Sequence, residues 1–306
     1  MRLCECVLWC GIVLSASAAS ARDIYVSNTA GDDRWQGIET ENRFEGAGPT
    51  RTIAKALRIA AAGDRIVIAN TDVPYRESLS LVGERHSGFP HEPFTIEGNG
   101  AVLDGSAPVV PEAWEYYTGD VFRFRPARLG HQQLFLGDRP AVRRPARSAD
   151  YKLPELAPLE WCLAGGYINL RVEAGKIPQQ YEASYATLQT GVTLYQVHDV
   201  RISNLVVQGF QLDGINAHDS VFGGQLAGVL CRGNGRAGIS VGGASRVEII
   251  DSVSGDNGAA QLRIEGYSHT HVTDTELIDN TAPATVVRGG KLYIDGKRVD
   301  AGSVDL

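Results

Sequence analysis

Side chains suited to chemistry recur in this 306-residue sequence at steps of 23 or 24 residues. The positions are Tyr195, His218, Gly242, Glu265 and Arg288. A histidine can act as a general base, and an arginine can hold a carboxylate or stabilise developing negative charge. Such spacing is useful only if the backbone repeats with the same period and brings these residues into one row.

The backbone pattern does repeat with this period. Units begin at Val192, Gly214, Gly238, Gln261 and Ala284, so their steps are 22, 24, 23 and 23 residues. Each unit contains two short apolar runs separated by a Gly/Ser/Asp turn and closed by a Gly/Asn turn. A fixed period of this length indicates a solenoid whose repeats bury their apolar faces against each other. The runs are too short for helices, alternate with period two and are rich in Val and Ile, which predicts an all-β parallel β-helix.

The closing turns carry amide side chains 23 residues apart. They are Gln211, Asn234, Asn257 and Asn280. Amides at equivalent turns can hydrogen-bond along the stack, so we expect an amide ladder here.

Alternation within the first strand of each unit assigns the side chains that face outward. With Ile215, Ile239 and Ile264 in the core, the row that opened this section points outward. Beside it runs a second row, which consists of Thr193, Asn216, Ser240, Arg263 and Val286. Neighbouring rungs lie about 4.8 Å apart, so Gly242 leaves a gap of roughly 10 Å between His218 and Glu265, where a sugar ring fits.

The residues before the repeat predict the closed end of a solenoid. We expect one amphipathic helix at 52–62, ending at Gly63, and short strands at 23–27, 65–69, 79–82, 94–97 and 101–103. The first rung of a solenoid would expose its core, and a helix laid over it acts as a cap. After Gly289 and Gly290, a strand at 291–294 and a turn at 295–296 are expected to cover the far end.

This N-terminal part resembles the entrance of secreted right-handed β-helix proteins of the pectate lyase-like superfamily. The segments that carry the resemblance are 23–27, 31–33, 48–53, 62–68 and 75–77. With the repeat, it covers residues 23–105 and about 185–295. It implies a right-handed parallel β-helix, but the superfamily includes lyases, glycoside hydrolases and non-catalytic proteins, so it does not choose an activity.

Residues 111–183 break the period and predict a small inserted antiparallel β module. Strands are expected at 121–125 and 133–136, and a hairpin at 161–172. The segment is rich in arginine within an otherwise acidic chain: Arg123, Arg125, Arg128, Arg139, Arg143, Arg144 and Arg147. Arg143, Arg144 and Trp114 are candidates for binding an anionic glycan. The alternative is an ordinary hairpin with outward arginines and an aromatic core.

Cleavage of a uronide chain by β-elimination needs a base and a cation that stabilises the enolate. We assign His218 as the candidate base, with Arg263, Glu265 and Arg288 as further catalytic candidates and Tyr195 and Asn216 as substrate-binding ones. The alternative is a solvated ladder of charges beside a histidine at the edge of a turn.

Hydrolysis instead needs two carboxylates, about 5 Å or about 6.5–9.5 Å apart. The segments 213–215, 238–242 and 263–265 faintly resemble polygalacturonase motifs. The paired aspartates of that family are absent, and Ala237 and Glu265 replace its histidine and lysine. An acidic turn before a core residue explains Asp213 equally well.

Many superfamily lyases use calcium, which needs several oxygen ligands in one place. The candidate aspartates are scattered over turns, where such side chains usually cap backbone amides: Asp213, Asp219, Asp251 and Asp256. We therefore expect no metal and no cofactor.

Composition and the N-terminus limit the cellular setting. A net charge of −7 argues against general nucleic-acid binding. Residues 1–21 have the pattern of a signal peptide with cleavage after Ala21, and no later run is long enough to span a membrane. We expect a secreted or periplasmic monomer. Cys162 and Cys231 remain after cleavage, either paired or as buried small apolar residues.

The predicted organisation is a signal peptide (1–21), an N-terminal cap with the first rungs (22–110), an inserted β module (111–183), and the main rungs with a C-terminal cap (184–306). The predicted function is a polysaccharide lyase-like enzyme acting on an extracellular, anionic polysaccharide. A non-catalytic glycan-binding or surface-structural protein and a glycoside hydrolase are the alternatives.

Overall fold

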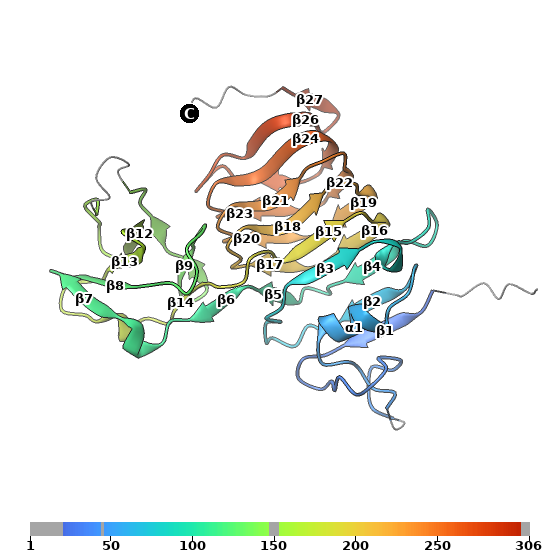
Figure 1. Ribbon diagram of the computed structural model, residues 1–306, viewed down its shortest axis with the longest axis horizontal. Helices are drawn as coiled ribbons and strands as arrows, with labels where there is room; N and C mark the ends of the chain where they lie inside the picture. The colour runs from blue at the N-terminus through green and yellow to red at the C-terminus, as the bar shows by residue number, and fades with distance from the viewer. Residues whose placement is uncertain (1–20, 44–45, 147–152, 301–306) are drawn as a thin grey trace, which may run out of the picture.

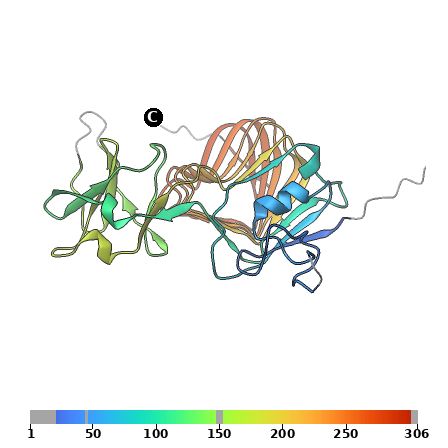
Figure 2. The same cartoon turned by 60° about the horizontal axis from the view of Figure 1, so that its bottom comes forward.

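The computed structural model describes residues 21–43, 46–146 and 153–300. Except for Ala21, the predicted signal peptide lies outside these residues, as does Arg147. The chain forms a coil of short parallel strands with three faces, and the inserted module lies beside it (Figures 1 and 2). The predicted parallel β-helix is therefore confirmed.

The first face carries the rows of outward side chains predicted above. Its strands are β3 (Leu79–Val82), β15 (Val192–Tyr195), β18 (Asp213–His218), β21 (Ala237–Val241) and the first parts of β24 (Ala260–Thr273) and β26 (Thr285–Ile294). All of these neighbours pair in parallel. Tyr195 pairs with His218, and Asn216 with Ser240, as the period requires.

The second face is formed by the next strand of each rung. Its strands are β1 (Asp23–Val26), β2 (Arg65–Ile68), β4 (Phe94–Glu97), β16 (His198–Ser203), β19 (Phe222–Ala227), β22 (Arg246–Ile250) and the second parts of β24 and β26. Because β24 and β26 run on from one face to the other, the two faces join into one sheet. At the far end, β27 (Lys297–Val299) folds back antiparallel on β26.

The third face is the shortest. Its parallel strands are β5 (Val102–Asp104), β17 (Val206–Gln208), β20 (Leu230–Arg232), β23 (Val253–Gly255) and β25 (Glu276–Leu277). Inward Val, Ile and Leu side chains from the three faces form one continuous core along the coil. The core residue of one rung thus packs on that of the next, as the apolar alternation predicts.

The helix α1 (Ile53–Ile59) closes the N-terminal end of the coil (Figure 2). The Thr52 hydroxyl accepts a hydrogen bond from the Lys55 amide, and the Glu77 carboxylate accepts from the amides of Ile53 and Ala54. The helix is shorter than predicted because Ala60 is already extended. Its apolar side joins the core of the coil, as expected for a cap.

The amide ladder forms in part. The Asn234 side chain donates to the Asn257 side chain at 3.0 Å, and Gln261 lies between Asn257 and Asn280. Gln211 instead donates to the carbonyl oxygen of Ala186, 3.3 Å away. The period places the amides correctly, but local contacts decide which of them meet.

The described residues between 106 and 186 form two small sheets beside the coil (Figure 1). One contains β6 (Ser106–Pro108), β9 (Leu134–Leu136), β10 (Arg139–Pro140) and β14 (Ala183–Ala186). The other contains β7 (Glu115–Thr118), β8 (Val121–Phe124), β11 (Val142–Arg143), β12 (Glu160–Ala164) and β13 (Tyr167–Arg171), with β12 and β13 forming the predicted hairpin. Single turns of 3₁₀ helix complete the chain at Glu84–His86, Pro111–Ala113 and Pro178–Gln180.

Both cysteines of the described chain are free and buried, so Cys162 and Cys231 do not form a disulfide. Cys162 lies in the module, and Cys231 lies in the core of the coil. Among the described residues, no helix is long and apolar enough to cross a membrane.

Candidate functional site

A groove of about 380 Å³ lies on the first face, at the ends of its strands. We call it the first groove. Its lining residues are Tyr195, Asn216, His218, Asp219, Arg236, Ser240, Gly242, Gly243 and Glu265. Four of the candidates named from the sequence therefore meet in one concave site, because the rungs are in the register that the period predicts.

The floor of the first groove is bare backbone. A Cβ atom added to Gly242 would meet only the Glu265 Cβ within 4 Å, at 3.9 Å. The neighbouring Gly243 has a φ of 63°, and a Cβ atom there would lie 2.4 Å from the Asp219 carbonyl oxygen. Gly243 is thus required by the turn, whereas Gly242 leaves open space beside Glu265.

Glu265 is held as a carboxylate by its neighbour on the same strand. Arg263 donates a hydrogen bond to Glu265 and forms an ion pair with it. This hydrogen bond is the main reason why the pKa of Glu265 is below its ordinary value of 4.5, and it outweighs the opposing effect of partial burial. The Arg263 side chain is only 14% exposed and does not line the groove, so it holds the Glu265 carboxylate without itself facing the groove.

A second ion pair lies under the groove. Arg236 donates from Nε to Asp213 Oδ1 at 2.9 Å, and the Asp213 side chain is fully buried. Arg236 itself lines the groove. A buried carboxylate is stable only with such a partner, so this pair fixes the position of the Arg236 guanidinium.

His218 and Tyr195 form the opposite side of the first groove. Their ring centroids are 5.1 Å apart, with planes inclined at 50°. On the next position of the turn, the Asp219 carboxylate accepts a hydrogen bond from the Gln196 side chain at 2.9 Å. The groove thus has aromatic rings and one carboxylate on one side of the glycine floor and Glu265 on the other.

The remaining candidates lie outside the groove lining. Arg288 pairs in register with Glu265 on the next strand and is exposed. In the module, Arg144 forms an ion pair with Glu160, and the Arg143 guanidinium lies 5.3 Å from the centre of the Trp161 ring. Trp114 is partly buried and packs edge-on against Phe124 of the module core, with 4.8 Å between ring centroids. This placement favours the alternative in which Trp114 has a packing role.

The module nevertheless approaches one end of the first groove. A Cβ atom on Gly235, next to Arg236, would lie 3.0 Å from the backbone of His131. Burial lowers the pKa of His131, and the positive charges of Arg236 and Arg143 lower it further. His131 of the module and Arg236 of the coil are therefore electrostatic neighbours.

Sequence reasoning missed Asp219 and Arg236 as groove residues. Asp219 has the positive φ of a turn residue, 70°, which is the role predicted for it, but its carboxylate also lines the groove. Strand register sets Asp213 beside Ala237, so Arg236 is the chain neighbour of the register partner of Asp213, and this nearness was an available signal. Among the described residues, no three His, Cys, Asp or Glu side chains gather as potential metal ligands.

No protein-family model and no curated protein sequence matches this chain. Among solved structures, a glycoside hydrolase is 11% identical with a TM-score of 0.59, over 83% of this chain and 73% of the hydrolase. The complex of XylC with xylose is 13% identical with a TM-score of 0.44, over 89% and 69% of the two chains. Pectate lyase Pel9A is 10% identical with a TM-score of 0.31, over 92% and 79%. At these identities the comparison shows similarity of fold alone, and the glycoside hydrolase is the structure on which this conclusion rests. This chain is similar to that enzyme in its β-helical architecture.

Proposed function

We propose that this protein binds an extracellular polysaccharide in the first groove and hydrolyses a glycosidic bond there, with Asp219 and Glu265 as the two acting carboxylates. The observation that carries the proposal is that both carboxylates line one groove on opposite sides of a bare glycine floor. The glycoside hydrolase of similar fold is consistent with a carbohydrate substrate.

The spacing of the two carboxylates favours inversion at the anomeric carbon. Asp219 and Glu265 lie two rungs apart, so their backbones are separated by roughly 10 Å. Inverting enzymes need about 6.5–9.5 Å between carboxyl groups to hold a water molecule, whereas retaining enzymes need about 5 Å. A separation of two rungs is closer to the longer distance than to the shorter one.

The surroundings of Glu265 assign the roles of the two carboxylates. Arg263 keeps Glu265 ionised, which suits a general base that takes a proton from water. As the other carboxylate of the groove, Asp219 is assigned the general-acid role, protonating the departing sugar oxygen while the water attacks the anomeric carbon. Tyr195 and His218 offer ring faces beside the same gap, and Asn216 and Ser240 offer polar groups for sugar hydroxyls.

The second candidate function is β-elimination on an anionic polysaccharide, with His218 as the base. The observation in its favour is that His218 lines the groove beside the glycine floor. This chemistry also needs a cation for the uronate carboxylate. Arg236 and Arg263 are each already paired with a carboxylate, which leaves Arg288 at the exposed end of the row as the cation for this route. For this reason we place hydrolysis first.

Product analysis distinguishes the proposals. The protein is incubated with neutral and acidic polysaccharides, including xylan and polygalacturonate, and reducing ends and ultraviolet absorbance are followed together. New reducing ends without absorbance support hydrolysis, and new absorbance from unsaturated uronides supports elimination. Binding without either product supports the non-catalytic alternative and contradicts both enzyme proposals.

We also propose that the chain is exported and acts as a monomer. The basis for export is the N-terminal pattern that ends at Ala21. Expression with the full N-terminus, followed by mass spectrometry of the mature protein, tests cleavage after Ala21. Light scattering tests the oligomeric state.

A further inference from the structure

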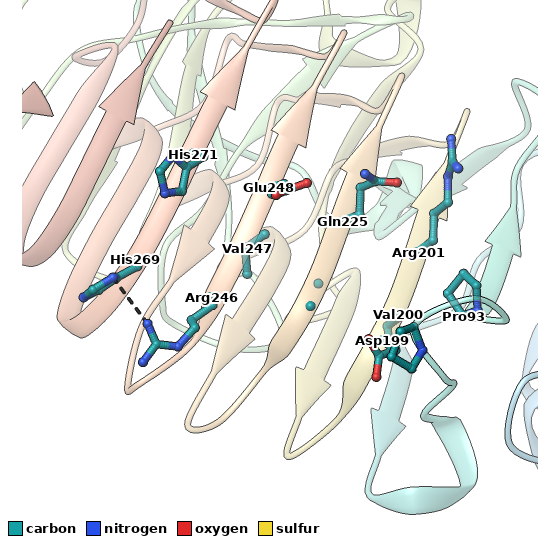
Figure 3. A pocket seen from close by; sticks show the side chains of 13 residues that line it. Pro93, Asp199, Val200, Arg201, Gln225, Arg246, Val247, Glu248, His269 and His271 are labelled. Atoms are coloured by element: carbon teal, nitrogen blue, oxygen red, sulfur yellow. Dashed lines mark hydrogen bonds between the residues drawn. The ribbon is translucent and has the colours of Figure 1, made fainter. Parts of the chain in front are cut away.

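A second groove, of about 550 Å³, lies on the second face of the coil (Figure 3). We call it the second groove. It is lined by residues of four successive rungs and by two prolines: Pro90, Pro93, Asp199, Val200, Arg201, Gly223, Gly224, Gln225, Arg246, Val247, Glu248, His269 and His271. It shares no residue with the first groove.

One row of polar side chains runs along this groove. Strand register places Arg201, Gln225, Glu248 and His271 side by side, one from each rung. Within the described part of the chain, the side chains of Arg201, Gln225 and Glu248 make no hydrogen bond or ion pair with the protein. These donors and acceptors, spaced about 4.8 Å apart, remain free for a ligand.

The two ends of the row differ from its middle. His271 stacks on Tyr293 of the next strand, with ring centroids 4.8 Å apart and planes inclined at 6°, so its ring is fixed in orientation. At the other end, Pro90 and Pro93 form a wall in the loop before β4. The prolines therefore limit the groove at its Arg201 end.

A second row along the groove contains a gap. Arg246 pairs in register with His269 and donates a hydrogen bond toward its ring, with a nitrogen–nitrogen distance of 3.4 Å (Figure 3). The position on the preceding rung is occupied by Gly223, beside Asp199. Gly223 has a φ of 62°, and a Cβ atom added there would lie 2.9 Å from Asp199 Oδ1, so the turn requires glycine and the second row has no side chain at this rung.

We propose that the second groove is a non-catalytic binding site for a polysaccharide strand, which lies along the row from Arg201 to His271. A glycan fits because sugar hydroxyls both donate and accept hydrogen bonds, as the mixed row does. Two arginines are balanced by Asp199 and Glu248, which does not favour a polyanion such as a nucleic acid. The identity of the ligand as a glycan rests on the proposed function.

Affinity electrophoresis in gels containing xylan, polygalacturonate or alginate tests the proposal. The variant combines Arg201→Ala, Gln225→Ala and Glu248→Ala, all on exposed or half-exposed strand positions. The control is Glu276→Ala, an exposed glutamate on the third face. Because three hydrogen-bonding groups are removed, we expect at least about a tenfold weaker retardation by the polysaccharide that binds the wild type. The control is expected to behave as the wild type, and all proteins are expected to have the same denaturation midpoint.

Cleavage measurements separate this site from the first groove. The triple variant is expected to cleave short oligosaccharides at the wild-type rate. Retardation equal to that of the wild type, or no retardation of the wild type by any of the three polysaccharides, overturns the proposal. If the variant loses retardation although no polysaccharide is cleaved even by the wild type, the second groove is supported and the proposed hydrolysis fails.

Discussion

The first and second grooves are built on the same coil from the same rungs, yet their charges are organised differently. In the first groove, Arg236 and Arg263 are each paired with a carboxylate of the protein. In the second groove, the described side chains of Arg201, Gln225 and Glu248 have no such partners. A common backbone repeat therefore supports both a site with fixed charges and a surface with free hydrogen-bonding groups.

The difference suggests different tasks. Charged groups that are held in place before the substrate arrives can stabilise a transition state without reorganising. The unpaired side chains on the exposed strands of the second face are not held by protein partners. They can therefore adapt to several arrangements of hydroxyl groups along a polysaccharide chain. The predictions below test this contrast between a reactive face and a binding face.

The largest effect is expected on catalysis. Glu265→Gln and Asp219→Asn should each lower kcat by about 10²–10⁴-fold, because each removes a proton-transfer group. The matched change on the second face, Glu248→Gln, should leave kcat within about twofold of the wild type. Initial rates on short oligosaccharides of the polysaccharide that the wild type cleaves provide the measurement. Wild-type rates in Glu265→Gln would contradict the assignment of the first groove.

The next effect concerns stability. Arg236→Met leaves the fully buried Asp213 carboxylate without its partner and should lower the free energy of unfolding by about 3–5 kcal/mol. Arg201→Met on the second face should change it by no more than about 0.5 kcal/mol. Urea denaturation of both variants measures the difference. Equal stability of the two would show that the two faces are not organised differently.

A smaller effect is expected from filling the floor of the first groove. Gly242→Ala adds a methyl group whose only neighbour within 4 Å is the Glu265 Cβ at 3.9 Å, so the fold should tolerate it. The methyl group occupies space proposed for a sugar ring, and kcat/KM should fall by about tenfold. Steady-state kinetics together with a denaturation midpoint test both halves of this expectation. An unchanged kcat/KM would show that no substrate group enters this gap.

The smallest effect is a pH dependence on the second face. A hydrogen bond to Asp199 is the main cause that raises the pKa of His198 above its ordinary value of 6.5, with Glu84 contributing. The charged form is favoured in the folded state, so this contribution to stability is complete below pH 6.5 and is lost as the pH rises through the folded pKa. Because the His198 side chain is 40% exposed, the loss should be only a few tenths of a kcal/mol.

The control for this effect is His198→Gln. Its free energy of unfolding should not show the fall above pH 6.5 that the wild type shows. A first-groove carboxylate behaves in the opposite sense. The lowered pKa of Glu265 contributes stability that is present above pH 4.5 and lost as the pH falls through the folded pKa. Denaturation curves measured across both pH ranges would therefore assign each change in the free energy of unfolding to the first or the second face.

The sequence predicted much of the fold because the repeat is local and regular. The spacing of Tyr195, His218, Gly242 and Glu265 defined a row, and the strand register confirms it. The end of the helix was misplaced because Ala60 is extended, which residue preferences did not reveal. Trp114 is half-buried and packs on Phe124, a contact with the module that its sequence position did not reveal, and its role in glycan binding stays a prediction.

The sequence by itself determined which residues face outward together. The 23-residue period assigns each residue to a rung, and the alternation of inward and outward side chains along a strand assigns the side to which it points. The tertiary structure decided which of them form sites. It paired Arg263 with Glu265, brought Asp219 into the first groove, and placed His131 of the module near Arg236. These contacts depend on side-chain conformation and on the position of an inserted segment. Neither follows a period, so neither can be predicted from the repeat.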